Sequence, residues 1–125
     1  MKKSNLITFV KLWLPPLLWA IVIFILSSIP QIKVSQFLIW DFIAKKTAHL
    51  IEYAVLFALI FRASQGKWVK SFFLTMIYAA SDEYHQSFVP GRTSSIFDLG
   101  FDLSGTGIAS YICHILSKHT TVRKN

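Results

Sequence analysis

An uncharged run from residue 12 to residue 32 limits the folds open to this chain more than any other feature. A helix needs about 20 mainly apolar residues to cross the hydrocarbon core of a bilayer, so this run is long enough to span one. Three lysines precede it, and basic residues mark the cytoplasmic end of membrane helices. A signal peptide starts in a similar way, but the end of this run lacks the small residues of a cleavage site. The run therefore predicts a membrane-spanning helix, with Pro15 and Pro16 in its first turn.

The composition indicates the same environment for the rest of the chain. Hydrophobic residues make up 54%, the mean hydropathy is +0.51, and only 15% of the residues are charged, against about 25% in soluble domains. A length of 125 residues holds four spans and leaves no room for a second globular domain. We therefore expect an all-α polytopic membrane protein, a four-transmembrane-helix bundle in the single domain 1–125. Its spans are expected at about 12–29, 43–61, 70–88 and 96–117.

The net charge of +7 reflects topology better than a nucleic acid partner, because no basic stretch is long enough to follow a phosphate backbone. The N-terminus, the 62–70 loop and the C-terminal tail hold nine of the 13 Lys and Arg residues. The positive-inside rule then places both termini in the cytoplasm and all six acidic residues in the outer half. The single cysteine, Cys113, excludes an intramolecular disulfide and a cysteine-based zinc site.

Polar residues recur at three- to four-residue intervals in each of the last three predicted helices, which places them on one stripe of each helix. From a rise of 1.5 Å per residue, we expect three carboxylates to lie roughly 9 Å below the outer surface and two histidines roughly 5 Å below it. Ser27 and Ser28 leave the first helix at the same level. The stripes are Lys46, His49 and then Glu52 or Tyr53; Asp82, His85 and Gln86; and Asp98, Asp102 and Gly105.

These ionisable groups have to face the interior of the bundle and pair there. A charged side chain within a membrane helix costs about 2.5 to 3.5 kcal/mol even on the lenient insertion scale. We expect Lys46 and Arg92 to pair with the carboxylates. Interhelical polar contacts also hold membrane helices together, and this purely structural role is the alternative. Five carboxylates, two histidines and an arginine near one depth exceed what helix association requires, so a functional site is favoured.

The polar motifs resemble those of the VanZ-like family, and the resemblance spans nearly the whole chain. The most specific is the string SDEYHQSFVPGR from residue 81 to residue 92. Around it lie Lys46-x-x-His49-x-x-Glu52-Tyr53, then Asp98 and Asp102-x-x-Gly105, and Ser27-Ser28-x-Pro30 at the end of the first helix. The family often has asparagine where Asp102 stands, so this chain adds a potential charge.

The resemblance implies a small integral protein of the bacterial plasma membrane with a role in the cell envelope. The namesake of the family is associated with resistance to teicoplanin, a glycopeptide antibiotic with a lipid tail, and no established reaction comes with the name. The expected partner is therefore a membrane lipid, a lipid-linked envelope precursor or a lipoglycopeptide, bound in the outer leaflet where headgroups and acyl chains meet.

Two sets of residues are candidates for this site. The candidates for acid–base chemistry in hydrolysis or group transfer are His49, Glu52, Asp82, Glu83, His85 and Asp98. The candidates for ligand binding are Ser28, Lys46, Tyr53, Gln86, Arg92 and Asp102, among which Arg92 can engage a phosphate or carboxylate bidentately.

Catalysis stays an open question at the level of the sequence. No cofactor is expected, apart from a divalent metal that His49-x-x-Glu52, Asp82-x-x-His85 and Asp98 would hold. A non-enzymatic protein that binds a lipid or modulates a membrane partner is the second class. A proton- or ion-coupled transporter is less favoured, because no carboxylate is predicted in the cytoplasmic half. The sequence does not predict an oligomeric state.

Overall fold

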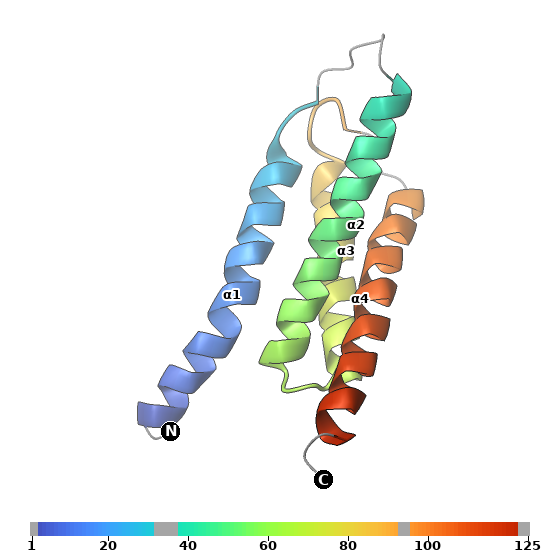
Figure 1. Cartoon of the computed structure of the whole chain (residues 1–125). Helices are drawn as coiled ribbons and strands as arrows, with labels where there is room; N and C mark the ends of the chain where they lie inside the picture. The colour runs from blue at the N-terminus through green and yellow to red at the C-terminus, as the bar shows by residue number, and fades with distance from the viewer. Residues whose placement is uncertain (1–2, 32–37, 93–95, 123–125) are drawn as a thin grey trace.

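The structure, a computed structural model, describes residues 3–31, 38–92 and 96–122. Within these ranges the chain forms four helices and no strand, which confirms the all-α prediction. The helices are α1 (Lys3–Ser28), α2 (Leu38–Ala63), α3 (Trp68–Gln86) and α4 (Ile96–Val122). Figure 1 shows the start of α1, the end of α4 and the α2–α3 connection at one end of the molecule. The end of α1, the start of α2, the end of α3 and the start of α4 lie at the opposite end.

Helix α1 begins at Lys3, so Pro15 and Pro16 lie inside it and the prediction that they occupy its first turn is wrong. The prediction placed the start of the helix at the start of the uncharged run, but a helix also forms over the polar residues that precede such a run. The Thr8 hydroxyl, for example, donates to the Ser4 carbonyl 3.0 Å away. Helix α3 ends at Gln86 because the approach to Pro90 disfavours further helical turns.

Helix α1 is, among the described residues, the one helix that is long and apolar enough to cross a membrane by length and composition. The prediction of four spans therefore stays a prediction at this point. The topology prediction also relies partly on Lys2, Arg123 and Lys124, which lie outside the described residues.

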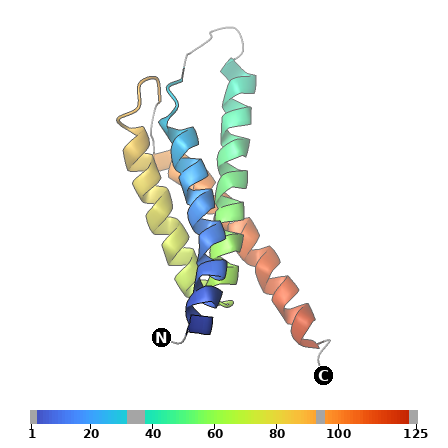
Figure 2. The same ribbon diagram turned by 90° about the vertical axis from the view of Figure 1, so that its left-hand side faces the viewer.

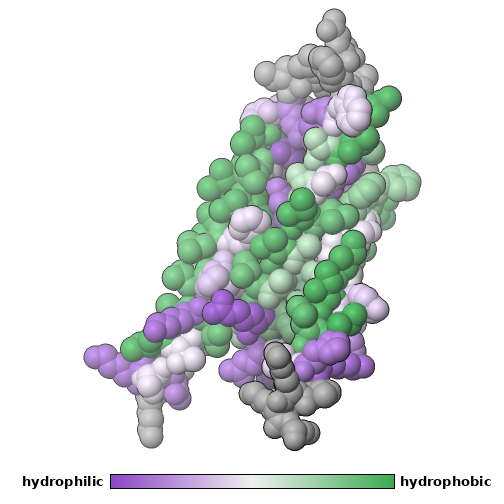
Figure 3. Space-filling view, viewed as in Figure 1, coloured by the Kyte–Doolittle hydropathy of each residue, from purple (hydrophilic) through white to green (hydrophobic). Residues whose placement is uncertain are grey.

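The helices bury small polar residues against one another and expose large apolar side chains. Buried positions on facing helices include small polar residues such as Ser71, Thr75 and Thr106, and membrane helices commonly associate through such residues. Figure 3 shows hydrophobic residues over the length of the helices and hydrophilic residues gathered near their ends. Large apolar side chains are exposed on every helix, among them Leu17, Ile43, Ile51, Phe73, Ile77, Ile108 and Leu116.

Two glycines allow backbone segments to approach closely and so position the polar residues. A Cβ on Gly105 of α4 would overlap the Leu50 carbonyl of α2, so only glycine permits this helix contact. Gly91 has a φ of +78°, and a Cβ there would overlap the backbone of Gln31. The Gln31 amide donates to the Pro90 carbonyl 3.2 Å away. The turn after α3 is thereby fixed against the end of α1, as the view in Figure 2 also shows.

Candidate functional site

Helix α2 lies at the centre of a polar cluster near the end of the molecule opposite the termini. Lys46 forms an ion pair with Asp98 of α4, which confirms that Lys46 pairs with a carboxylate. One turn further along α2, His49 Nδ1 lies 3.1 Å from Asp102 Oδ1, also on α4. The close contact at Gly105 brings this stripe of α2 against the acidic stripe of α4.

A second, more deeply buried set of contacts joins α2 to α3. The Tyr53 hydroxyl donates to Asp82 Oδ2 over 2.8 Å, and the Gln86 amide donates to the same oxygen over 2.9 Å. Tyr53 is fully buried and Asp82 is 3% exposed. Asp82 Oδ1 and Asp102 Oδ2 are also buried, and neither has a hydrogen-bond partner among the described residues. The cluster therefore retains hydrogen-bond acceptors that a ligand or water has to satisfy.

Two cavities open beside the cluster. The larger has a volume of about 270 Å³, and Lys46, His49, Gln86, Arg92 and Asp98 contribute to its lining. The smaller, of about 80 Å³, is lined by His49, Glu52 and Arg92 among others. His49 and Arg92 line both, so they join the two cavities into one polar site.

Arg92 is held in a different way from the one predicted. Its Nη2 donates to the Leu26 carbonyl over 2.6 Å and its Nε donates to the Ile29 carbonyl over 3.2 Å. The arginine thus caps carbonyls at the end of α1, where a helix leaves such groups without partners and favours a cation. Burial lowers the pKa of the Arg92 guanidinium, although the carboxylates of Asp82, Glu52 and Glu83 oppose this shift. Arg92 remains a cation that contributes to both cavities.

His85 lies apart from this site. Its Nε2 is 3.0 Å from the Ser28 hydroxyl, and its ring stacks on Phe24 with 4.5 Å between the ring centroids. The two histidines that the sequence grouped at one depth therefore face different neighbours: His49 faces α4, and His85 faces α1. Glu83 is half-buried on α3 and lines neither cavity.

The described residues contain no group of three His, Cys, Asp or Glu side chains arranged to hold a metal ion. In particular, the residues proposed as ligands are distributed among separate pairs. His49 lies with Asp102, Asp82 with Tyr53 and Gln86, and His85 with Ser28. A bound divalent metal stays a prediction from the sequence.

Three residues that the sequence did not single out also take part in the site: Gln31, Asp41 and Lys45 line the larger cavity. Ser27, which was expected at the level of the polar residues, accepts a 3.4 Å hydrogen bond from Gln86. Gln31 directly follows the Ser27-Ser28-x-Pro30 motif, and Lys45 directly precedes Lys46. This closeness to predicted site residues was the one feature of the sequence that could have indicated them. Their role depends on how the connections fold, which the helical period does not predict.

The fold and the cluster together define a class of protein: a small all-helical chain with one helix suited to a membrane and a polar site near one end. The chain belongs to the VanZ/LLP1 family, whose model matches residues 2–117. The family is associated with membranes and is loosely linked to antibiotic resistance. This match confirms the resemblance that the motifs indicated. No curated protein and no solved structure is similar enough to the chain to match it.

Proposed function

We propose that the chain is a multi-pass protein of the bacterial plasma membrane, with four spans in one domain and both termini in the cytoplasm. One support is the alternation of the helices, which places both termini and the α2–α3 connection at one end. That end carries Lys67 and Lys70, as the positive-inside rule requires of a cytoplasmic end. The exposed apolar side chains on α2, α3 and α4 are the second support, because lipid would cover them.

The polar cluster is then a binding site near the outer surface of the membrane, and its ligand is an amphipathic molecule with a polar or charged head. The observation that carries this proposal is the polar cavity between α2, α4 and the turn after α3, where Lys46, His49, Arg92 and Asp98 meet. Ionisable side chains in membrane helices are candidates for function by default, because their burial is costly. The cavity offers cations and two carboxylates, Asp41 and Asp98, which suits a head that carries phosphate, carboxylate or amine groups.

A lipid-linked envelope precursor and a teicoplanin-type lipoglycopeptide both have this chemistry. Each joins an apolar tail to a polar head, so the head would occupy the cavity while the tail stays in the outer leaflet. Membership of the VanZ/LLP1 family favours these ligands over an unrelated lipid, given its link to antibiotic resistance. In this role the protein acts by binding or sequestering the ligand, or by modulating a partner that uses it.

The pair formed by His49 and Asp102 supports a second candidate function, hydrolysis or group transfer on the same ligand. A carboxylate 3.1 Å from one ring nitrogen fixes the orientation of the imidazole, and the other ring nitrogen is then the one to accept a proton. Since His49 lines both cavities, it is better placed than His85 to act as a general base. Turnover that stops in His49→Gln while binding persists would distinguish catalysis from binding alone.

The proposal predicts that substitutions in the cavity remove function without removing the protein. In a teicoplanin-sensitive host, expression of the chain should raise the inhibitory concentration of the drug, and His49→Ala and Asp98→Asn should each abolish this protection. His119→Ala, at an exposed position near the end of α4, is the matched control and should protect fully. The amount of folded protein in the membrane is measured for each variant.

A parallel measurement covers the lipid-linked ligand. The purified chain in nanodiscs is titrated with a lipid-linked peptidoglycan precursor, and the His49→Ala and Asp98→Asn variants should bind it at least about tenfold more weakly, which corresponds to the loss of one charge-assisted hydrogen bond. If protection and binding decline only in proportion to the loss of folded protein, the cluster is structural. If the unmodified chain neither protects nor binds, the proposed ligand class is wrong.

A further inference from the structure

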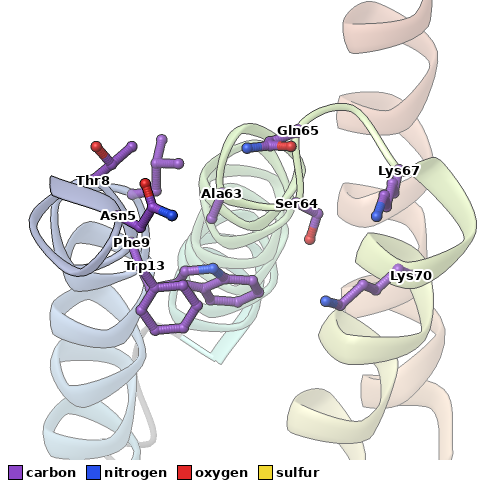
Figure 4. Close-up of a pocket in the computed structure, with 10 residues that line it drawn as sticks. Asn5, Thr8, Phe9, Trp13, Ala63, Ser64, Gln65, Lys67 and Lys70 are labelled. Atoms are coloured by element: carbon purple, nitrogen blue, oxygen red, sulfur yellow. The ribbon is translucent and has the colours of Figure 1, made fainter. Parts of the chain in front are cut away.

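A third cavity lies at the opposite end of the molecule from the polar cluster, beside the first turns of α1. It has a volume of about 380 Å³ and lies between the first turns of α1, the end of α2 and the start of α3. Its lining includes Asn5, Thr8, Ser64, Lys67 and Lys70. Figure 4 shows Lys70 extending from α3 toward the aromatic rings of α1, and its Nζ lies 5.4 Å from the centre of the Trp13 ring.

This cavity is positively charged. Lys67 and Lys70 line it, and among the residues that the structure describes no aspartate or glutamate does. Helix α3 also begins here, with no side-chain cap and no acidic residue in its first turn, so the positive end of its dipole adds to the two lysines.

Ser64 supplies the observation that indicates a ligand. Its side chain lines the cavity, is only 5% exposed, and its Oγ has no hydrogen-bond partner among the described residues. A buried hydroxyl is nearly always hydrogen-bonded in a folded protein. A ligand oxygen in the cavity would satisfy it and would be neutralised by the two lysines.

The cavity leads into an apolar groove of about 390 Å³ between α1, α2 and α3, since Phe9 and Trp13 line both. The rest of the groove is formed by apolar side chains such as Leu17, Leu56 and Ile60, together with Tyr78, whose hydroxyl is already bonded to the Ala20 carbonyl. A cationic, hydrogen-bonding end therefore continues into a slot that suits a hydrocarbon chain.

We infer that this site binds one anionic phospholipid of the adjacent leaflet. Its phosphate would contact Lys67, Lys70 and the Ser64 hydroxyl, and one acyl chain would follow the groove along α1. The inference rests on the proposed embedding of the chain in a membrane and is independent of the polar cluster at the other end. The apolar groove favours a lipid over a soluble phosphate as the ligand, because only a lipid has an acyl chain that can fill the groove.

The test measures the retention of dioleoylphosphatidylglycerol and dioleoylphosphatidylcholine by the purified full chain with native mass spectrometry. The unmodified protein should bind the anionic lipid more tightly, and Lys67→Gln/Lys70→Gln should weaken that binding on the order of tenfold. Lys11→Gln/Lys118→Gln is the matched control, since it removes the same charge from exposed lysines that do not line the cavity. It should retain the lipid as the unmodified protein does.

Two further arms separate the contributions of the head and the tail. Ser64→Ala should weaken binding of the anionic lipid several-fold, and Ala20→Phe, which fills the groove, should weaken binding of both lipids. Melting of each variant in lipid-free detergent verifies that it is folded. Equal losses in the two lysine pairs would show a general charge effect and overturn the site. Displacement of the lipid by an equimolar amount of glycerol phosphate would overturn the lipid assignment.

Discussion

Replacing Gly105 with alanine should lower the free energy of unfolding by about 1–3 kcal/mol, the usual cost of overpacking a tight contact. The added methyl group would overlap the Leu50 carbonyl, and this backbone atom cannot rotate away as the end of a side chain can. Helices α2 and α4 then have to separate, which also moves His49 away from Asp102. The effect is measured by thermal or denaturant-induced unfolding in detergent, monitored by circular dichroism.

Gly107→Ala is the matched control for this prediction. It makes the same change two residues further along α4, where a Cβ meets nothing within 4 Å. Because alanine is favoured over glycine in helices by up to about 1 kcal/mol, this variant should be as stable as the unmodified chain or slightly more stable. Equal stability of Gly105→Ala and Gly107→Ala would contradict the close contact between α2 and α4.

Replacing Tyr53 with phenylalanine should destabilise the chain by about 1–3 kcal/mol, because it removes one of the two hydrogen bonds that a buried carboxylate oxygen accepts. Asp82 Oδ2 would lose the donor that lies 2.8 Å away and retain only the Gln86 amide. The aromatic ring itself is kept, so the loss reports on the hydrogen bond and not on packing. Unfolding in detergent gives the free energy difference.

Tyr84→Phe removes a hydroxyl from an exposed tyrosine of α3 and should leave the stability unchanged. A double-mutant cycle with Asp82→Asn then isolates the pair, and residues in direct contact should show a coupling of about 1 kcal/mol. Additive effects of Tyr53→Phe and Asp82→Asn would mean that the two side chains do not interact. The account of the contact between α2 and α3 would then be wrong.

The contacts between helices are the part of the site that the sequence could predict. Lys46, His49, Asp98 and Asp102 recur at helical spacing, so each stripe has to face one neighbour. The need to pair buried charges predicted that Lys46 meets a carboxylate. It did not choose between the acids of α3 and those of α4, so the pairs of Lys46 with Asp98 and of His49 with Asp102 come from the structure.

The roles of Arg92 and His85 could not be predicted in this way. Arg92 lies in a turn, and its partners are carbonyls of α1 that are more than 60 residues away in the chain. Helical periodicity carries no information on such a contact, whereas the carboxylates expected as partners act on Arg92 through their charge. His85 and Gln86 are adjacent, yet they face α1 and the interior respectively, because neighbouring positions on a helix differ by about 100°.

The cavity at the other end of the molecule could not be predicted from the sequence either. Its lining comes from three helices, and its volume depends on the crossing of α1 over α2 and α3. Lys67 and Lys70 entered the sequence analysis only as part of the basic loop that the positive-inside rule places in the cytoplasm. What joins them into a site is the arrangement of the helices, to which a single sequence gives no access.

The proposed function requires the polar cluster to lie near the outer surface of the membrane and the chain to cross that membrane several times. The most direct test places single cysteines at the two ends of the molecule in a Cys113→Ser background. Ser87 lies directly after α3, at the end of the molecule that holds the polar cluster, and Ser4 lies at the start of α1. Both serines are exposed, and the two variants are Ser87→Cys and Ser4→Cys. Spheroplasts that express each variant are treated with a membrane-impermeant maleimide, before and after permeabilisation.

We expect Ser87→Cys to be labelled in intact spheroplasts and Ser4→Cys to be labelled only after permeabilisation. The reverse result would place the cluster at the cytoplasmic surface, and labelling of both cysteines from outside would mean that the two ends of the molecule do not lie on opposite sides of the membrane.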